Sequence, residues 1–174
     1  MTESIIGALL AMVLFLAVYL DIRTSRIPNW LTFTAMGGGL FTHILLEGVH
    51  GAVFSLSGLG TGLILFLALY FLGDIGAGDV KLMGAIGAII GPYGAFISCI
   101  SAVMVGGIYA LGAMCYQWGI ALTGRKIAYA IQRALLSGGD GWTQELKLPF
   151  HLRYGLAIVG GTLLFLSGFH PFGG

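Results

Sequence analysis

Charged residues are scarce in this sequence, and their scarcity excludes whole classes of protein. Only 9% of the 174 residues are charged, against about 25% in an ordinary soluble domain. The formal net charge is +1, so the chain lacks the clustered basic surface that nucleic-acid binding requires. Hydrophobic residues make up 57% of the sequence. No soluble fold of this length could bury so much apolar sequence, and we therefore expect a membrane protein.

Cysteine is equally scarce. The two cysteines, Cys99 and Cys115, fall in one apolar segment. On a single helix they would lie about 24 Å apart, too far for a disulfide. The sequence has no C-x-x-C pair and no H-E-x-x-H motif, and its histidines are scattered. We therefore expect no metal site, no cofactor and no serine–histidine–acid catalytic set.

Long apolar runs are what the sequence has in abundance. Five of them reach or approach the roughly 20 residues needed to cross a bilayer, and a sixth, 80–91, is shorter but is interpreted as a further helix. They are about 4–20, 29–46, 52–72, 80–91, 93–116 and 154–169. The first is not interpreted as a cleaved signal peptide, because Asp21-Ile22-Arg23 follows it in place of a small-residue cleavage site. The sequence predicts an all-α polytopic protein with about six transmembrane helices in a single domain, 1–174.

The basic residues give this arrangement an orientation. If the six runs cross the membrane in turn, all eight basic residues fall on the same side. They are Arg23, Arg26, Lys81, Arg125, Lys126, Arg133, Lys147 and Arg153. The positive-inside rule assigns that side to the cytoplasm, which places the N- and C-termini outside. We expect a multi-pass protein of the cytoplasmic (inner) membrane.

The segment 123–137 differs from the apolar runs. One helical face carries the apolar residues Ile127, Ile131, Ala134 and Leu135. The charged residues of the segment are Arg125, Lys126 and Arg133. This pattern predicts an amphipathic helix on the cytoplasmic membrane surface, with a solvated loop as the alternative.

Glycine is frequent, with 30 residues. Gly87-x-x-x-Gly91 and the series Gly58, Gly60, Gly62 predict small-residue faces on which helix backbones approach each other closely. We interpret these glycines as packing residues.

The predicted topology sorts the seven acidic residues. Two fall on the outer side, and two fall in the long cytoplasmic loop, where a solvated charge is the ordinary interpretation. The remaining three, Asp21, Asp74 and Asp79, lie at cytoplasmic ends of apolar runs. Ionisable groups at membrane depth are costly and tend to be functional, so these three are the candidates for chemistry.

Asp21 directly follows the first apolar run, and Pro28-Asn29 then separates the first helix from the second. The carboxylate is therefore expected at the mouth of a helix. The alternative is a helix-end carboxylate that only pairs with Arg23 or Arg26.

Asp79 stands in the sequence Gly76-Ala-Gly78-Asp79-Val-Lys81. The two glycines remove side chains, so a peptide backbone could approach the carboxylate. Gly76, Gly78 and Lys81 thus form a predicted substrate-approach loop. The alternative is that Asp79 merely caps a helix N-terminus, where aspartate is favoured.

Taken together, Asp21 and Asp79 on one membrane face suit aspartyl proteolysis. Two close carboxylates share one proton in that chemistry, because like charges about 3 Å apart cannot both ionise. The ionised carboxylate acts as general base on a water, and the protonated one polarises the scissile carbonyl.

Two segments carry a resemblance to a known family. Asp21–Asn29 and Gly76–Leu82 resemble the two signatures of the type IV prepilin peptidases, the Gly-x-Gly-Asp membrane aspartyl proteases. The resemblance covers roughly residues 1–120. It implies that Asp21 and Asp79 are the catalytic dyad and that the partner is a prepilin or pseudopilin. It also implies a role in type IV pilus biogenesis or secretion.

The sequence departs from the family pattern in two places. It has no paired C-x-x-C region for methylation, so it resembles the short form found with tight-adherence (Flp) pili or archaeal preflagellin processing. Near the end of the chain, 148–155 matches the Pro-Tyr-Gly of the family only loosely. No role is therefore carried over to Pro149, Tyr154 or Gly155.

Two other functions remain open at this point. A small proton-coupled transporter or a membrane scaffold could use Asp21 and Asp79 as proton or ion sites. It would place them near the bilayer midplane beside broken helices. A presenilin-like protease would pair a Tyr-Asp motif with Gly-x-Gly-Asp, whereas Tyr19-Leu20-Asp21 has a residue between.

Overall fold

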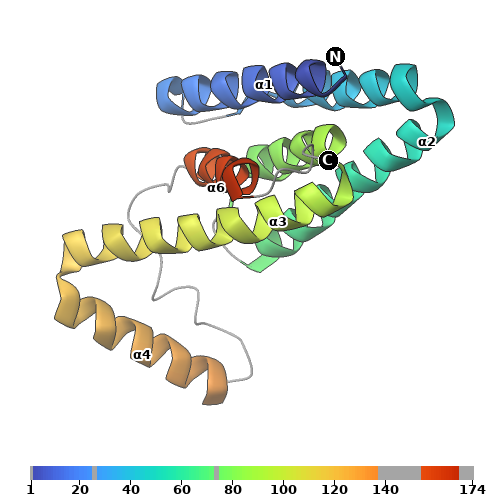
Figure 1. Cartoon of the computed structure of the whole chain (residues 1–174). Helices are drawn as coiled ribbons and strands as arrows, with labels where there is room; N and C mark the ends of the chain where they lie inside the picture. The colour runs from blue at the N-terminus through green and yellow to red at the C-terminus, as the bar shows by residue number, and fades with distance from the viewer. Residues whose placement is uncertain (1, 25–26, 73–74, 137–153, 169–174) are drawn as a thin grey trace. The chain divides into compact units, whose positions relative to one another are not determined.

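The computed structural model describes residues 2–24, 27–72, 75–136 and 154–168. Every element in these ranges is an α-helix, which confirms the predicted all-α class (Figure 1). The helices are α1 (Thr2–Thr24), α2 (Asn29–Leu72), α3 (Ala77–Trp118), α4 (Ile120–Leu136) and α6 (Tyr154–Gly168).

Three of these helices are long and apolar enough to cross a membrane. The candidate spans are Ser4–Thr24, Asn29–Phe71 and Ala77–Gln117, with mean hydropathies of 2.5, 2.1 and 1.9. The helix α6 is also apolar but shorter, with its apolar part at Tyr154–Ser167. Exposed large side chains such as Phe15, Phe41 and Ile64 cover the outer faces of α1 and α2, as expected of helices in contact with lipid.

The helices α2 and α3 each contain two of the predicted apolar runs, joined at a single glycine. Gly48 breaks α2 with φ 59 and ψ −130, and Gly91 breaks α3 with φ 79 and ψ 178. Positive φ angles are accessible to glycine at little steric cost. Figure 1 shows the path of both helices changing direction between their two arms. A straight helix of 44 residues would be about 66 Å long, roughly twice the bilayer core, so the bend gives α2 two arms of membrane length.

The break in α3 leaves backbone carbonyl groups without their usual helical donors. Pro92 follows Gly91 and supplies no N–H to the preceding turn. Side chains of α2 donate instead. Ser55 Oγ donates to the Ala88 carbonyl at 2.8 Å, and His43 Nε2 lies 2.9 Å from the Ile89 carbonyl. Because a carbonyl oxygen only accepts, Nε2 of His43 carries the proton.

Glycine faces bring α2 and α3 into backbone contact. A Cβ at Gly58 would overlap the backbone of Gly87 and Gly91, and a Cβ at Gly62 would overlap the backbone of Met83. The predicted small-residue packing is therefore confirmed for Gly58, Gly62, Gly87 and Gly91. Gly60 has open space around it, because it lies two positions from each neighbour and so points away from the shared face.

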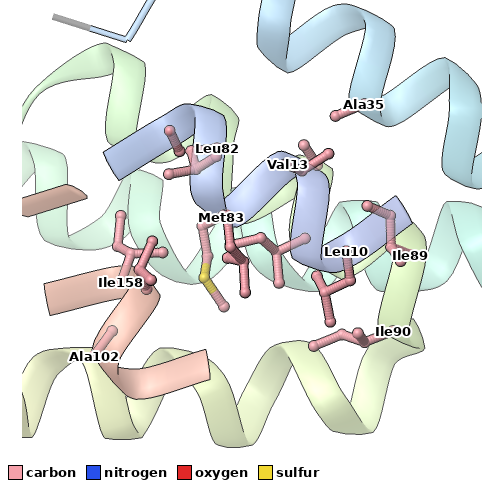
Figure 2. Close-up of a cluster of buried hydrophobic side chains, with 14 of the residues drawn as sticks. Leu10, Val13, Ala35, Leu82, Met83, Ile89, Ile90, Ala102 and Ile158 are labelled. Carbon is pink, nitrogen blue, oxygen red and sulfur yellow. The ribbon is translucent and has the colours of Figure 1, made fainter. Parts of the chain in front are cut away.

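The chain divides into two compact units. The first consists of residues 1–106 and 153–174, and the second of residues 107–152. Four helices contribute buried apolar side chains to the core of the first unit (Figure 2). The side chains labelled there are Leu10, Val13, Ala35, Leu82, Met83, Ile89, Ile90, Ala102 and Ile158.

The second unit contains the end of α3 and all of α4. Gly119, with φ 77, separates the two helices. The carbonyl of Gly119 accepts from Thr123 N at 3.1 Å and from Thr123 Oγ1 at 2.9 Å, so α4 begins before the predicted start at 123. The predicted amphipathic helix is confirmed as far as Leu136, with residue 137 outside the described residues.

Candidate active site

Asp21 lies in the last turn of α1, at the end of its buried stripe. Leu10, Val13, Leu14 and Ala17 are buried at helical spacing, and Asp21 is the next position on this face. Its side chain is only 5% exposed. The packing of α1 against the rest of the first unit therefore buries this carboxylate.

The two arginines near Asp21 are placed differently. Arg23 is exposed, and its guanidinium lies 5.1 Å from the centre of the Tyr19 ring, a cation–π arrangement. Arg26, the other partner considered for Asp21, lies outside the described residues. The buried face of α1 carries Asp21, and its exposed face carries Arg23.

Asp79 lies in the first turn of α3, where it helps to begin the helix. The Gly76 carbonyl accepts from Asp79 N at 3.0 Å and from Val80 N at 3.3 Å. In return, Gly76 N donates to Asp79 Oδ2 at 3.2 Å. This is the reciprocal half of a capping box, so the capping role considered for Asp79 is present. A carboxylate has about four acceptor sites, and the cap leaves acceptor capacity on Asp79.

The structure brings the two aspartates together although they are far apart in the sequence. The charge of Asp21 acts on Asp79, which is half-buried. The carboxylates come from the end of α1 and the start of α3. The third candidate, Asp74, lies outside the described residues.

Gly76 and Gly78 of the predicted approach loop lie close to other residues of the protein itself. A Cβ at Gly78 would lie 3.3 Å from Ile27 Cβ and 3.4 Å from the Ile27 carbonyl oxygen. A Cβ at Gly76 would lie 3.1 Å from Asp79 Oδ2. Gly78 therefore lets the connection after α1 pack onto the start of α3, which sequence reasoning did not anticipate. Passage of a substrate peptide past these glycines stays a prediction.

Lys81 joins the two signature segments. Its Nζ donates to Asn29 Oδ1 at 2.8 Å and lies 5.5 Å from the centre of the Phe33 ring. Asn29 begins α2, and Lys81 lies in the second turn of α3. The hydrogen bond therefore ties the start of one helix to the start of the other beside the aspartates.

Gly155, in the first turn of α6, lies against the side chain of Asp21. A Cβ at Gly155 would lie 2.7 Å from Asp21 Oδ2 and 3.0 Å from Asp21 Cγ. The neighbouring Tyr154 packs on α3, where its ring would lie 2.9 Å from a Cβ at Gly106. The sequence signal for this contact was the loose match around Tyr154 and Gly155. Pro149 lies outside the described residues.

Metal ligands do not gather in the part of the chain that the structure describes. No group of three or more His, Cys, Asp or Glu side chains is found within those ranges. Both cysteines are free thiols, Cys99 buried and Cys115 partly buried.

Comparison with known proteins identifies the family. Residues 8–111, well over half of the chain, match the type IV leader peptidase family. Both aspartates and both signature segments fall inside this stretch, and α6 falls outside it. Neither the curated proteins nor the solved structures give a match. The resemblance inferred from the signatures is confirmed, and the chain belongs to the type IV leader peptidase family.

Proposed function

We propose that this peptidase is a membrane-embedded aspartyl endopeptidase. It removes the leader peptide from type IV prepilins or pseudopilins, of the Flp-like kind, at the cytoplasmic face of the inner membrane. The observation that carries the proposal is that Asp21 and Asp79, two carboxylates from separate helices and separate signature segments, lie near enough for the charge of Asp21 to act on Asp79.

The proposed reaction divides the work between the two carboxylates. One is ionised and takes a proton from a water molecule, which attacks the scissile carbonyl carbon. The other is protonated, donates to the carbonyl oxygen, and so stabilises the charge that develops there. The proton taken from water is then given to the departing amine as the peptide bond breaks. The products are the free leader and a pilin with a new N-terminus.

The positions of the aspartates support an enzyme over a transporter or scaffold. A proton or ion pathway calls for carboxylates near the middle of the bilayer. Asp21 lies in the last turn of α1 and Asp79 in the first turn of α3, both at helix ends. A peptide substrate can reach helix ends from the aqueous side.

We infer further that α2 and α3 each cross the membrane twice, once on either side of Gly48 and of Gly91. Together with α1 and α6 this gives six crossings, with the termini outside. The basic residues of the described helices then lie on the cytoplasmic side, where the active site opens. They are Arg23, Lys81, Arg125, Lys126 and Arg133.

The dyad is tested by replacing each aspartate with asparagine. An amide can neither take a proton from water nor give one to the amine. General acid–base assistance is worth roughly 10²–10⁴ in rate for each group, and members of one catalytic unit are strongly non-additive. Asp21→Asn, Asp79→Asn and the double variant should therefore be almost equally inactive. Leader removal is measured by gel shift of a panel of Flp-like prepilins in detergent micelles, normalised to folded enzyme.

Asp74→Asn is the matched control, because Asp74 is an aspartate of the same connection without a signature around it. It should retain most activity. Substantial cleavage by Asp21→Asn or Asp79→Asn would rule out the aspartyl mechanism. Loss of all activity in folded Asp74→Asn would mean that the wrong aspartate had been paired with Asp21. A wild-type protein that cut none of the prepilins would favour the transporter or scaffold.

A further inference from the structure

We infer that Gly155, in the first turn of α6, is a positioning residue that holds the Asp21 carboxylate in place for the reaction. The inference rests on the proposed function for its catalytic consequence. The contact itself rests on geometry alone.

The Asp21 side chain lies directly against the backbone at Gly155. A Cβ there would lie 2.7 Å from Oδ2, 3.0 Å from Cγ and 3.3 Å from Cβ of Asp21. Heavy atoms of this kind do not pack closer than about 3.5 Å without strain. Any side chain at position 155 would therefore displace the carboxylate.

Asp21 has little room to move away. It is 5% exposed, and its helix face is packed into the core of the first unit through Leu14 and Ala17. The helices α1 and α6 contact each other directly. A methyl group at position 155 must push the Asp21 carboxylate or push the two helices apart, and either shift changes its geometry relative to Asp79.

The other glycines inside α6 have different neighbours and so provide matched controls. A Cβ at Gly160 would meet Val105 Cγ1 at 3.5 Å, an ordinary contact. A Cβ at Gly161 would overlap the backbone of Ala102 and Ser101 in α3. The same change, glycine to alanine, therefore tests the carboxylate contact, a neutral site and a purely structural clash on one helix.

Kinetics of the three variants separate positioning from folding. A displacement of about 1 Å at a catalytic group can cost about 100-fold in rate. Gly155→Ala should therefore lower kcat about 10- to 100-fold with little change in KM, because the substitution acts on the reacting carboxylate. Gly160→Ala should match the wild type. Gly161→Ala should lower the yield of folded protein, because its methyl group overlaps the backbone of α3.

A stability cycle tests the contact without any cleavage assay. Gly155→Ala is measured in the wild-type and in the Asp21→Ala background, by thermal unfolding in detergent. With the carboxylate present, the methyl group should lower the unfolding temperature. With the carboxylate removed, it should leave that temperature unchanged or raise it, because alanine favours a helix more than glycine does. If Gly155→Ala fails to fold alone, recovery of folding in the Asp21→Ala background supports the contact equally.

The outcomes distinguish this inference from the proposed function. The same effect of Gly155→Ala in both backgrounds would overturn the contact, and a wild-type kcat in Gly155→Ala would overturn the positioning role. A coupled stability cycle in a protein that cut no prepilin would overturn the proposed function and leave the contact standing.

Discussion

Asp79 makes two interactions with one side chain. Its Oδ2 accepts from Gly76 N at the start of α3, and its charge interacts with that of Asp21. The cap fixes the orientation of the carboxylate relative to α3 and still leaves it acceptor capacity for the role proposed in catalysis. Capping and catalysis are therefore compatible at this position.

The two interactions can be separated by comparing two substitutions at position 79. Asparagine keeps a side-chain oxygen that can accept from Gly76 N, whereas alanine keeps none. Asp79→Ala should therefore be less stable than Asp79→Asn by about 1 kcal/mol, while both are inactive. Thermal unfolding of the purified proteins in detergent measures the difference. Equal stability of the two variants would show that the hydrogen bond to Gly76 does not contribute.

At the residue scale, the catalytic role of Asp21 and Asp79 stays a prediction from the sequence. Asp21 and Asp79 followed from their signatures, because short motifs report the residue types that chemistry needs. The loose family match around Gly155 gave it no role, and its contact with Asp21 could not be predicted, since a close backbone approach depends on how α1 and α6 pack. For the same reason, Gly78 was expected to face a substrate peptide, and the structure places Ile27 against it.

At the scale of the helices, the six predicted apolar runs appear in four helices. The sequence analysis separated 29–46 from 52–72 and 80–91 from 93–116 as distinct helices, whereas the structure joins each pair through a single-residue break at Gly48 or Gly91. Helical structure continues up to each glycine, because glycine adopts the positive φ that turns the chain within a single residue. Apolar composition identifies such runs well but does not determine where a helix bends.

The hydrogen bonds at the Gly91 break predict a specific loss of stability. Ser55 is fully buried and donates to the Ala88 carbonyl of another helix, so Ser55→Ala leaves that carbonyl without this donor. The cost should be about 1–3 kcal/mol, with the cleavage rate per folded enzyme unchanged. Ser57→Ala is the control, because Ser57 is exposed and donates to Phe54 within its own helix. Unfolding temperatures that did not differ between the two variants would contradict this assignment.

At the scale of the whole molecule, large apolar side chains are exposed as well as buried, as expected of a protein that lies in lipid. Exposed apolar side chains such as Phe15 and Phe71 would promote aggregation in water, whereas their contact with lipid is not unfavourable. The long apolar helices and the family agree on a membrane protein. The number of crossings and their direction follow from the basic residues and remain predictions.

Cysteine labelling tests that topology. We expect Val49→Cys, next to the Gly48 bend, to be labelled from outside, and a cysteine placed in 138–145 to be labelled from the cytoplasm. Val49 is 79% exposed, whereas a cysteine at Gly48 would be strained by the positive φ there. Cys99 and Cys115 are first replaced by alanine, so that only the introduced thiol reacts. Labelling of both positions from one side would exclude six crossings.

The contact between Gly155 and Asp21 also has a consequence for biogenesis. The ribosome delivers both aspartates to the membrane long before it delivers α6. Until the chain has been synthesised past Gly155, Asp21 lacks the backbone surface that fixes its carboxylate. If Gly155 positions Asp21 as inferred, nascent chains inserted as far as α3 would carry both signature segments and cut poorly. The order of synthesis would then delay the assembly of the proposed site until α6 has been made.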